Sequence, residues 1–148
     1  MPTHKLIAIA GAVAVLGLLL VACGGADSGG SGVASTTPSG GVAVLSPQDY
    51  QKALAVGDPF LVNVHVPYEG EIEATDAFVP FDKVKQNVNA LPPDKDAPLY
   101  IYCRSGRMSA EAAIALREMG YTNIVDLAGG MEAWRAAGLP IVTRSEGP

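Results

Sequence analysis

The sequence has few of the residues that build metal sites or disulfide frameworks. Among its 148 residues there are only two cysteines, Cys23 and Cys103, and two histidines, His4 and His65. No cysteine pair has metal-ligand spacing and the histidines stand far apart, so we expect no metal site. A Cys23–Cys103 disulfide is possible on paper, but the two thiols lie in segments of different character, and we do not expect it.

Basic residues are also scarce. The chain carries 10 lysines and arginines against 15 aspartates and glutamates, for a formal charge of −5. Nucleic-acid-binding domains present a basic face, so this composition argues against nucleic acid as a partner. Small anionic substrates stay open because local charge decides their binding. The length allows one domain and a short appendage.

Residues 1–22 are predicted to be a signal peptide. A basic start precedes the apolar run Leu6–Ala22, which is shorter than the roughly 20 residues of a membrane span. The run ends in Leu20-Val21-Ala22-Cys23, which resembles the lipobox of bacterial lipoproteins. That resemblance implies cleavage before Cys23 and a lipid on its thiol. The protein would then be exported and anchored to the extracytoplasmic face of a bacterial membrane. An uncleaved transmembrane anchor is the alternative.

The lipidated cysteine begins a segment, residues 23–41, that is rich in glycine and serine. It has no apolar periodicity, so we interpret it as a flexible linker. The folded domain is predicted over 42–148.

Apolar runs and helix signals alternate along this domain. Ser46 and Pro47 mark a helix start, with serine as N-cap and proline at the first helical position. We predict strands over Val42–Leu45, Phe60–Val66, Leu99–Tyr102 and Ile124–Leu127, and a final edge strand at Ile141–Val142. We predict helices from Pro47 to Gly57, from Asp82 to about Leu91, from Ser109 to Met119 and after Gly130. This alternation predicts an α/β domain with a mostly parallel central sheet, flanked by helices on both faces.

Cys103 lies between a predicted strand and a predicted helix. Loop amides and the positive end of the helix would face its sulfur, and Arg104 and Arg107 stand nearby. Such surroundings favour thiolate over thiol, so this loop is the candidate active site. It reads Tyr102-Cys103-Arg104-Ser105-Gly106-Arg107-Met108-Ser109.

Spacing separates the chemistries that place a cysteine in such a loop. Cysteine-dependent phosphatases need an arginine six residues after the cysteine, and Ser109 occupies that position. A thioredoxin-type site needs a second cysteine where Gly106 stands. A cysteine–histidine hydrolase stays open, with His65 as the partner.

The loop resembles the active-site loop of single-domain rhodanese-like sulfurtransferases. A second stretch is similar to the C-terminal signature of that family. It reads Leu127-Ala128-Gly129-Gly130-Met131-Glu132-Ala133-Trp134, followed by Ala137-Gly138-Leu139-Pro140. The resemblance covers about Val44 to Val142.

The resemblance implies a sulfurtransferase that needs no cofactor. Cys103 would be the catalytic nucleophile, taking a sulfane sulfur from an anionic donor such as thiosulfate and passing it from a persulfide to a thiol or cyanide. A non-catalytic rhodanese-like binding module and an extracytoplasmic thiol redox protein are the alternatives. The implied substrate-binding residues are Arg104, Ser105, Gly106, Arg107, Met108 and Ser109.

The chain departs from the family pattern near the second strand. Asn63 and His65 stand where an aspartate and an arginine are expected, and Met108 replaces an arginine found in many members. An acidic stretch, Glu69 to Asp76, is expected to be a solvated loop.

Overall fold

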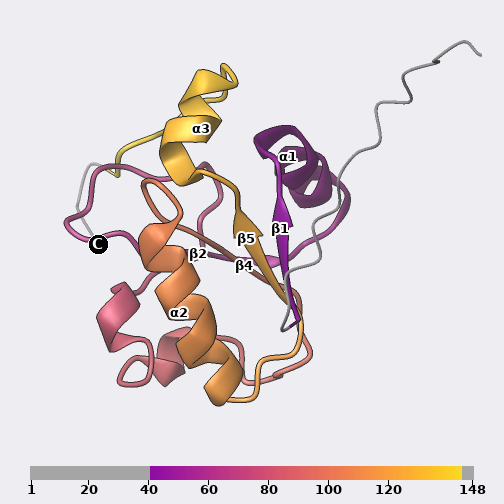
Figure 1. Ribbon diagram of the computed structural model, residues 1–148, viewed down its shortest axis with the longest axis vertical. Helices are drawn as coiled ribbons and strands as arrows, with labels where there is room; N and C mark the ends of the chain where they lie inside the picture. The colour runs from indigo at the N-terminus through magenta and orange to yellow at the C-terminus, as the bar shows by residue number, and fades with distance from the viewer. Residues whose placement is uncertain (1–40, 145–148) are drawn as a thin grey trace, which may run out of the picture. The chain divides into compact units, whose positions relative to one another are not determined.

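The computed structural model describes residues 41–144 (Figure 1). The predicted signal peptide, Cys23 and all of the predicted linker except Gly41 lie outside the described residues. Within this range, no helix is long and apolar enough to cross a membrane.

A five-stranded sheet forms the centre of the domain, with the strand order β1-β5-β4-β2-β3. All neighbouring strands in it are parallel. Ile101 at the centre of the sheet is paired with Val62 on one side and Asp126 on the other. The prediction of a mostly parallel α/β sheet is confirmed. The strands are β1 (Val42–Leu45), β2 (Phe60–Asn63), β3 (Ala77–Phe78), β4 (Leu99–Tyr102) and β5 (Ile124–Leu127).

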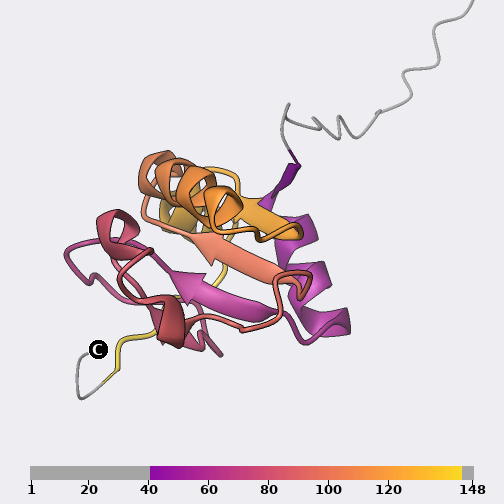
Figure 2. The ribbon, with the colours of Figure 1, turned by 90° about the horizontal axis from the view of Figure 1, so that it is seen from below.

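Helices cover both faces of the sheet (Figures 1 and 2). On one face lie α1 (Pro47–Val56) and α3 (Gly130–Ala136); on the other lie α2 (Arg107–Glu118) and the short 3-10 helices η1 (Phe81–Lys83) and η2 (Val88–Ala90). Each strand contributes side chains to the hydrophobic cores on both faces of the sheet, because successive side chains point to opposite faces. On β4, for example, Ile101 packs in the α2 core and Tyr102 in the α1–α3 core.

The first helix begins as its sequence predicts. The Ser46 hydroxyl accepts a hydrogen bond from the backbone N–H of Asp49 at 3.2 Å, and Pro47 is the first helical residue. Tyr50, a residue of this helix, is fully buried, and its hydroxyl donates a hydrogen bond to the carbonyl oxygen of Ile101. Trp134 packs in the same cluster and is 3% exposed.

Several local predictions were wrong. The helix expected from Asp82 to Leu91 is replaced by η1 and η2, consistent with the two asparagines in this segment and with Pro92 directly after it. The expected edge strand at Ile141–Val142 is only an isolated antiparallel bridge between Val142 and Glu71. The strand expected over Phe60–Val66 ends at Asn63.

The connections after β2 and β4 leave the sheet in opposite directions. The chain after β4 crosses through α2 to β5, whereas the chain after β2 passes to β3 on the other side. Ligands of open parallel sheets bind in the crevice at the carboxyl ends of strands where the direction reverses. The residues that follow β2 and β4 therefore lie at the expected place for a site.

Candidate active site

Cys103 is the first residue after β4, and it is 1% exposed. Its sulfur accepts a hydrogen bond from the backbone N–H of Gly106 at 3.0 Å. The hydroxyl of Ser109, in the first turn of α2, is 3.5 Å from the same sulfur and 3.1 Å from the carbonyl oxygen of Gly106. Two hydrogen-bond donors and the N-terminus of a helix thus surround the sulfur, an arrangement that stabilises negative charge on it.

The loop that carries Cys103 is fixed to the start of α3. The backbone N–H of Met131 donates to the carbonyl oxygen of Cys103 at 2.9 Å. The backbone N–H of Glu132 donates to the carbonyl oxygen of Arg104, also at 2.9 Å. Gly130 makes this approach possible because it has φ +57 and no side chain. The glycine pair of the second signature therefore contributes to the shape of the cysteine loop.

A pocket of about 310 Å³ lies beside the cysteine loop. Its lining brings together five of the residues expected at the site, namely Cys103, Arg104, Ser105, Arg107 and Met108, with His65 and Glu132. Gly106 reaches the sulfur through its backbone, and Ser109 lies buried behind it. The other six residues of the predicted loop site thus lie around Cys103.

The two arginines of the loop each meet a carboxylate. Nε of Arg104 lies 2.9 Å from Oε1 of Glu132, and one terminal nitrogen lies 3.5 Å from Oε1 of Glu69. Arg107 pairs with Glu111 at 2.9 Å, one turn along α2. Sequence reasoning missed these carboxylates as parts of the site. The i,i+4 spacing of Arg107 and Glu111 was a visible signal for one of them.

The two atypical residues after β2 have different surroundings. Asn63 is fully buried, donates to the carbonyl oxygen of Gly70 and accepts from the N–H of His65, both at 3.0 Å. His65 is 5% exposed, and neither of its ring nitrogens makes a hydrogen bond to another residue of the range 41–144. Nε2 lies 3.4 Å from Oε2 of Glu69, without hydrogen-bond geometry. Asn63 thus holds the loop, while His65 forms part of the pocket wall.

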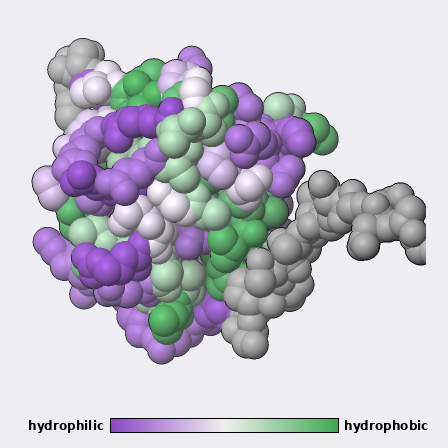
Figure 3. Space-filling view, turned by 45° about the horizontal axis from the view of Figure 1, so that its top comes forward, coloured by the Kyte–Doolittle hydropathy of each residue, from purple (hydrophilic) through white to green (hydrophobic). Residues whose placement is uncertain are grey.

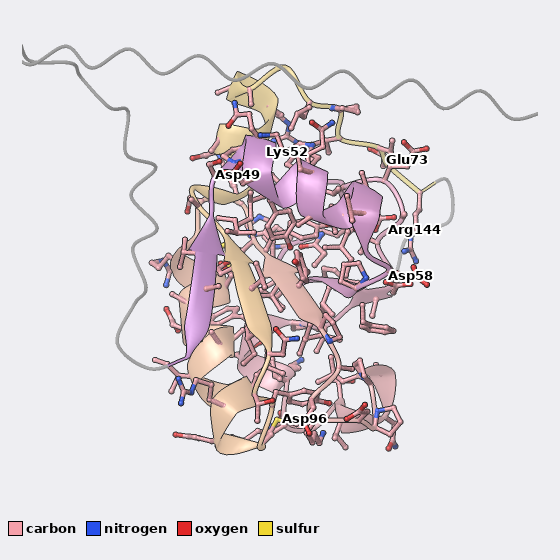
Figure 4. All side chains as sticks on the ribbon, turned by 90° about the vertical axis from the view of Figure 1, so that its right-hand side faces the viewer. Asp49, Lys52, Asp58, Glu73, Asp96 and Arg144 are labelled. Carbon is pink, nitrogen blue, oxygen red and sulfur yellow. The ribbon has the colours of Figure 1, made fainter. Side chains whose placement is uncertain are left out.

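The acidic stretch after β2 is not a wholly solvated loop. Glu71 is 4% exposed and forms an ion pair with Arg144, whose guanidinium also donates to the carbonyl oxygen of Thr75 at 2.6 Å. The N–H of Ile72 donates to the buried hydroxyl of Tyr102 at 3.0 Å. Figure 4 shows Arg144 on the side of the domain where Glu73 also lies. These contacts fasten the loop that positions Glu69.

Asp126 on β5 is a buried carboxyl close to the cysteine loop. It is 6% exposed, and its Oδ1 has no hydrogen-bond partner among the residues that the structure describes. Burial raises the pKa of Asp126 to about 6, although hydrogen bonding with Ser109 and the backbone of Leu127 opposes this shift. Ser109 therefore lies between the thiol and a titratable group.

No group of three or more histidine, cysteine, aspartate or glutamate side chains within residues 41–144 is placed to hold a metal ion. The face seen in Figure 3 carries mostly hydrophilic side chains, with apolar areas among them. The pocket lining includes the Cys103 residue, two arginines and the carboxylate of Glu132.

Comparison with known proteins agrees with this geometry. The rhodanese-like domain family matches residues 47–137. A sulfurtransferase of Allochromatium vinosum is 35% identical over 94 residues, which cover 62% of this chain and 86% of that protein. The thiosulfate sulfurtransferase PspE of Escherichia coli is 37% identical over 73 residues, covering 48% and 69%.

Solved structures show the same fold. A rhodanese-like domain protein from Staphylococcus aureus has a TM-score of 0.56 and 28% identity, over 68% of this chain and 98% of that one. A rhodanese-related protein from Thermoplasma volcanium has a TM-score of 0.58 at 24% identity, with the same coverage. Fold, loop and family match define one class of protein, an α/β domain with a cysteine loop at the carboxyl ends of its strands. The chain belongs to the rhodanese-like family.

Proposed function

We propose that the protein is a sulfurtransferase in which Cys103 carries the sulfur as a persulfide. The observation that supports this proposal is the buried thiol of Cys103 in a loop that lines a pocket, with the N–H of Gly106 at 3.0 Å from its sulfur. The relatives named as sulfurtransferases support the same reaction class.

The proposed reaction has two displacement steps. In the first, the Cys103 thiolate attacks the outer sulfur of an anionic donor such as thiosulfate. The sulfur–sulfur bond of the donor breaks, sulfite leaves with the electron pair, and Cys103 becomes a persulfide anion. In the second, cyanide or a thiolate attacks the outer sulfur, the bond to Sγ breaks, and the Cys103 thiolate is restored. Neither step involves a net oxidation or reduction of the reactants, so neither needs a cofactor.

The loop residues have separate parts in this scheme. The N–H of Gly106 and the hydroxyl of Ser109 stabilise charge on Sγ, as preorganised donors do at an anionic centre. Backbone amides from Arg104 to Ser109 and the N-terminus of α2 favour the charge of the outer sulfur. Ser105 and Met108 line the space that the donor would occupy.

The test is thiosulfate-to-cyanide sulfur transfer by the full chain in detergent, beside Cys103→Ser. We expect thiocyanate formation that is lost in the variant. Mass spectrometry of the protein after exposure to thiosulfate or polysulfide should show one added sulfur on Cys103. An unmodified thiol that still binds a partner would instead indicate the non-catalytic binding module. A trapped mixed disulfide with a partner, without sulfur transfer, would indicate a thiol redox protein.

We also propose that the chain is exported and anchored to a bacterial membrane through a lipid on Cys23. The support is the sequence Leu20-Val21-Ala22-Cys23, which lies outside the described residues. Replacement of Cys23 by alanine should release or mis-process the protein in cell fractionation. Normal anchoring of that variant would contradict the proposal.

A further inference from the structure

The charges at the pocket differ from those of a simple anion-binding site. Two guanidiniums would be expected to attract an anionic donor, but both are already paired with carboxylates. Arg104 contacts Glu132 and Glu69, and Arg107 contacts Glu111. With His65 neutral, these two arginines and three glutamates have a formal charge of −1.

The position of the carboxylates makes them relevant to the donor. Glu132 lines the pocket together with Cys103 and Arg104. Glu69 lies 3.4 Å from Nε2 of His65 and 3.5 Å from Arg104, and both of these partners line the pocket. The main chain of Glu69 is also held, since the guanidinium of Arg135 in α3 donates to its carbonyl oxygen at 3.4 Å.

Backbone groups at the site stabilise only one of the two negative charges that thiosulfate carries. The N–H of Gly106 and the N-terminus of α2 are directed at the sulfur of Cys103 and favour one negative charge there. The second charge of a dianion would have to compete with Glu132 and Glu69 for Arg104. Like charges brought together in a half-exposed pocket repel, even after screening by salt.

Resting on the proposed sulfurtransferase function, we propose that Glu69 and Glu132 are specificity-determining residues. They disfavour dianionic donors such as thiosulfate and favour singly charged donors, in which the sulfane sulfur is carried by an organic group. Organic persulfides and thiosulfonates belong to this class.

Methanethiosulfonate and thiosulfate form a matched pair for testing this proposal. Both present a terminal sulfur on a sulfonyl group, and they differ by a methyl group in place of a charged oxygen. With methanethiosulfonate, the Cys103 thiolate attacks the terminal sulfur and the sulfur–sulfur bond breaks. Methanesulfinate leaves with the electron pair, and the same Cys103 persulfide remains.

The experiment measures kcat/KM for each donor with cyanide as the common acceptor. Thiocyanate is then the product in both cases, and the rate with Cys103→Ser is subtracted as background. In a double-displacement reaction, kcat/KM for the donor reports the step in which the donor reacts. We expect Glu132→Gln to raise kcat/KM for thiosulfate about fivefold, and that for methanethiosulfonate by about twofold or less. Glu69→Gln should act in the same direction.

Glu118→Gln is the matched control. Glu118 is similarly exposed and forms an ion pair with Lys85 at 2.6 Å, at the far end of α2. The ratio of the two kcat/KM values should be unchanged in this variant. If Glu132→Gln and Glu69→Gln also leave the ratio unchanged while Cys103 still acquires sulfur, the inference is overturned and the proposed function stands. If neither donor adds sulfur to Cys103, the proposed function fails, and the inference with it.

Discussion

A side chain at Gly130 would overlap the carbonyl oxygen of Cys103. A Cβ atom built on Gly130 also lies 2.7 Å from the carbonyl oxygen of Arg104, which real Cβ atoms essentially never approach so closely. The cysteine loop and the start of α3 therefore pack backbone against backbone. This contact explains why two signatures separated in the sequence belong to one site.

Gly130→Ala should destabilise the domain by about 2 kcal/mol or more, because overpacking adds to the cost of a left-handed backbone. Urea unfolding measures this loss. Gly138→Ala is the control, since Gly138 has a similar φ of +79 but nothing within 4 Å of its Cβ position. Its expected loss is about 1 kcal/mol, from the backbone alone. Equal losses in the two variants would show that the close approach to Cys103 carries no cost.

The hydroxyl of Ser109 is expected to increase the reactivity of Cys103. It lies 3.5 Å from Sγ, and a hydrogen bond to a charged group stabilises it by about 1 kcal/mol or more. Ser109→Ala should therefore slow the alkylation of Cys103 by iodoacetamide at pH 7 about fivefold. Ser105→Ala retains both hydrogen bonds to the sulfur and should change the alkylation rate by less than about twofold. The interpretation fails if the two alanine variants are alkylated at the same rate.

The ion pair between Glu71 and Arg144 should contribute more stability than an exposed pair. The Glu71 side chain is 5% exposed, so Arg144→Ala leaves a buried carboxylate without its partner. Since the Arg144 side chain is 40% exposed, we expect a loss of about 1 to 2 kcal/mol in urea unfolding.

Two further variants test this assignment. Lys85→Ala removes a pair whose side chains are 57% and 58% exposed, and should cost less than about 0.5 kcal/mol. In the Glu71→Gln background, Arg144→Ala should cost less than it does in the native chain. If Arg144→Ala lowers the free energy of unfolding as much in that background as in the native chain, Arg144 acts through contacts other than the one with Glu71.

The sequence was sufficient to predict those parts of the fold that depend on local signals. The run Leu99–Tyr102 is apolar because both faces of β4 are covered, and Ser46 with Pro47 is a helix start that needs no tertiary contact. The segment around Asn87 carries local signals that misled the prediction, since Val84, Val88 and Leu91 follow the spacing of one helix face. Two short 3-10 helices form instead, and Val84 and Leu91, which directly follow them, pack in the core.

The sequence predicted the site residues within the cysteine loop, but it did not predict the residues from other segments that contact this loop. Cys103 to Ser109 are contiguous, so their convergence on one sulfur follows from a single turn. Glu69 and Glu132 contact Arg104 although they lie 35 and 28 residues away in the sequence. No local spacing pattern predicts contacts between residues so far apart. The partners of Arg104, and hence the charge of the pocket, required the three-dimensional structure.

The buried carboxyl of Asp126 should make the stability of the domain fall as pH rises. Burial raises its pKa to about 6, whereas an unfolded aspartate titrates near 3.9. Below about pH 4 both states hold the proton, and the carboxyl has no net effect. Between about pH 4 and 6 the unfolded chain releases its proton while the native chain keeps it, so the free energy of unfolding decreases by about 2 to 3 kcal/mol. The difference between native protein and Asp126→Asn in urea unfolding should change by this amount across the window. Asp58→Asn, at an exposed position, should show no such change, and an identical pH dependence in both variants would contradict the assignment.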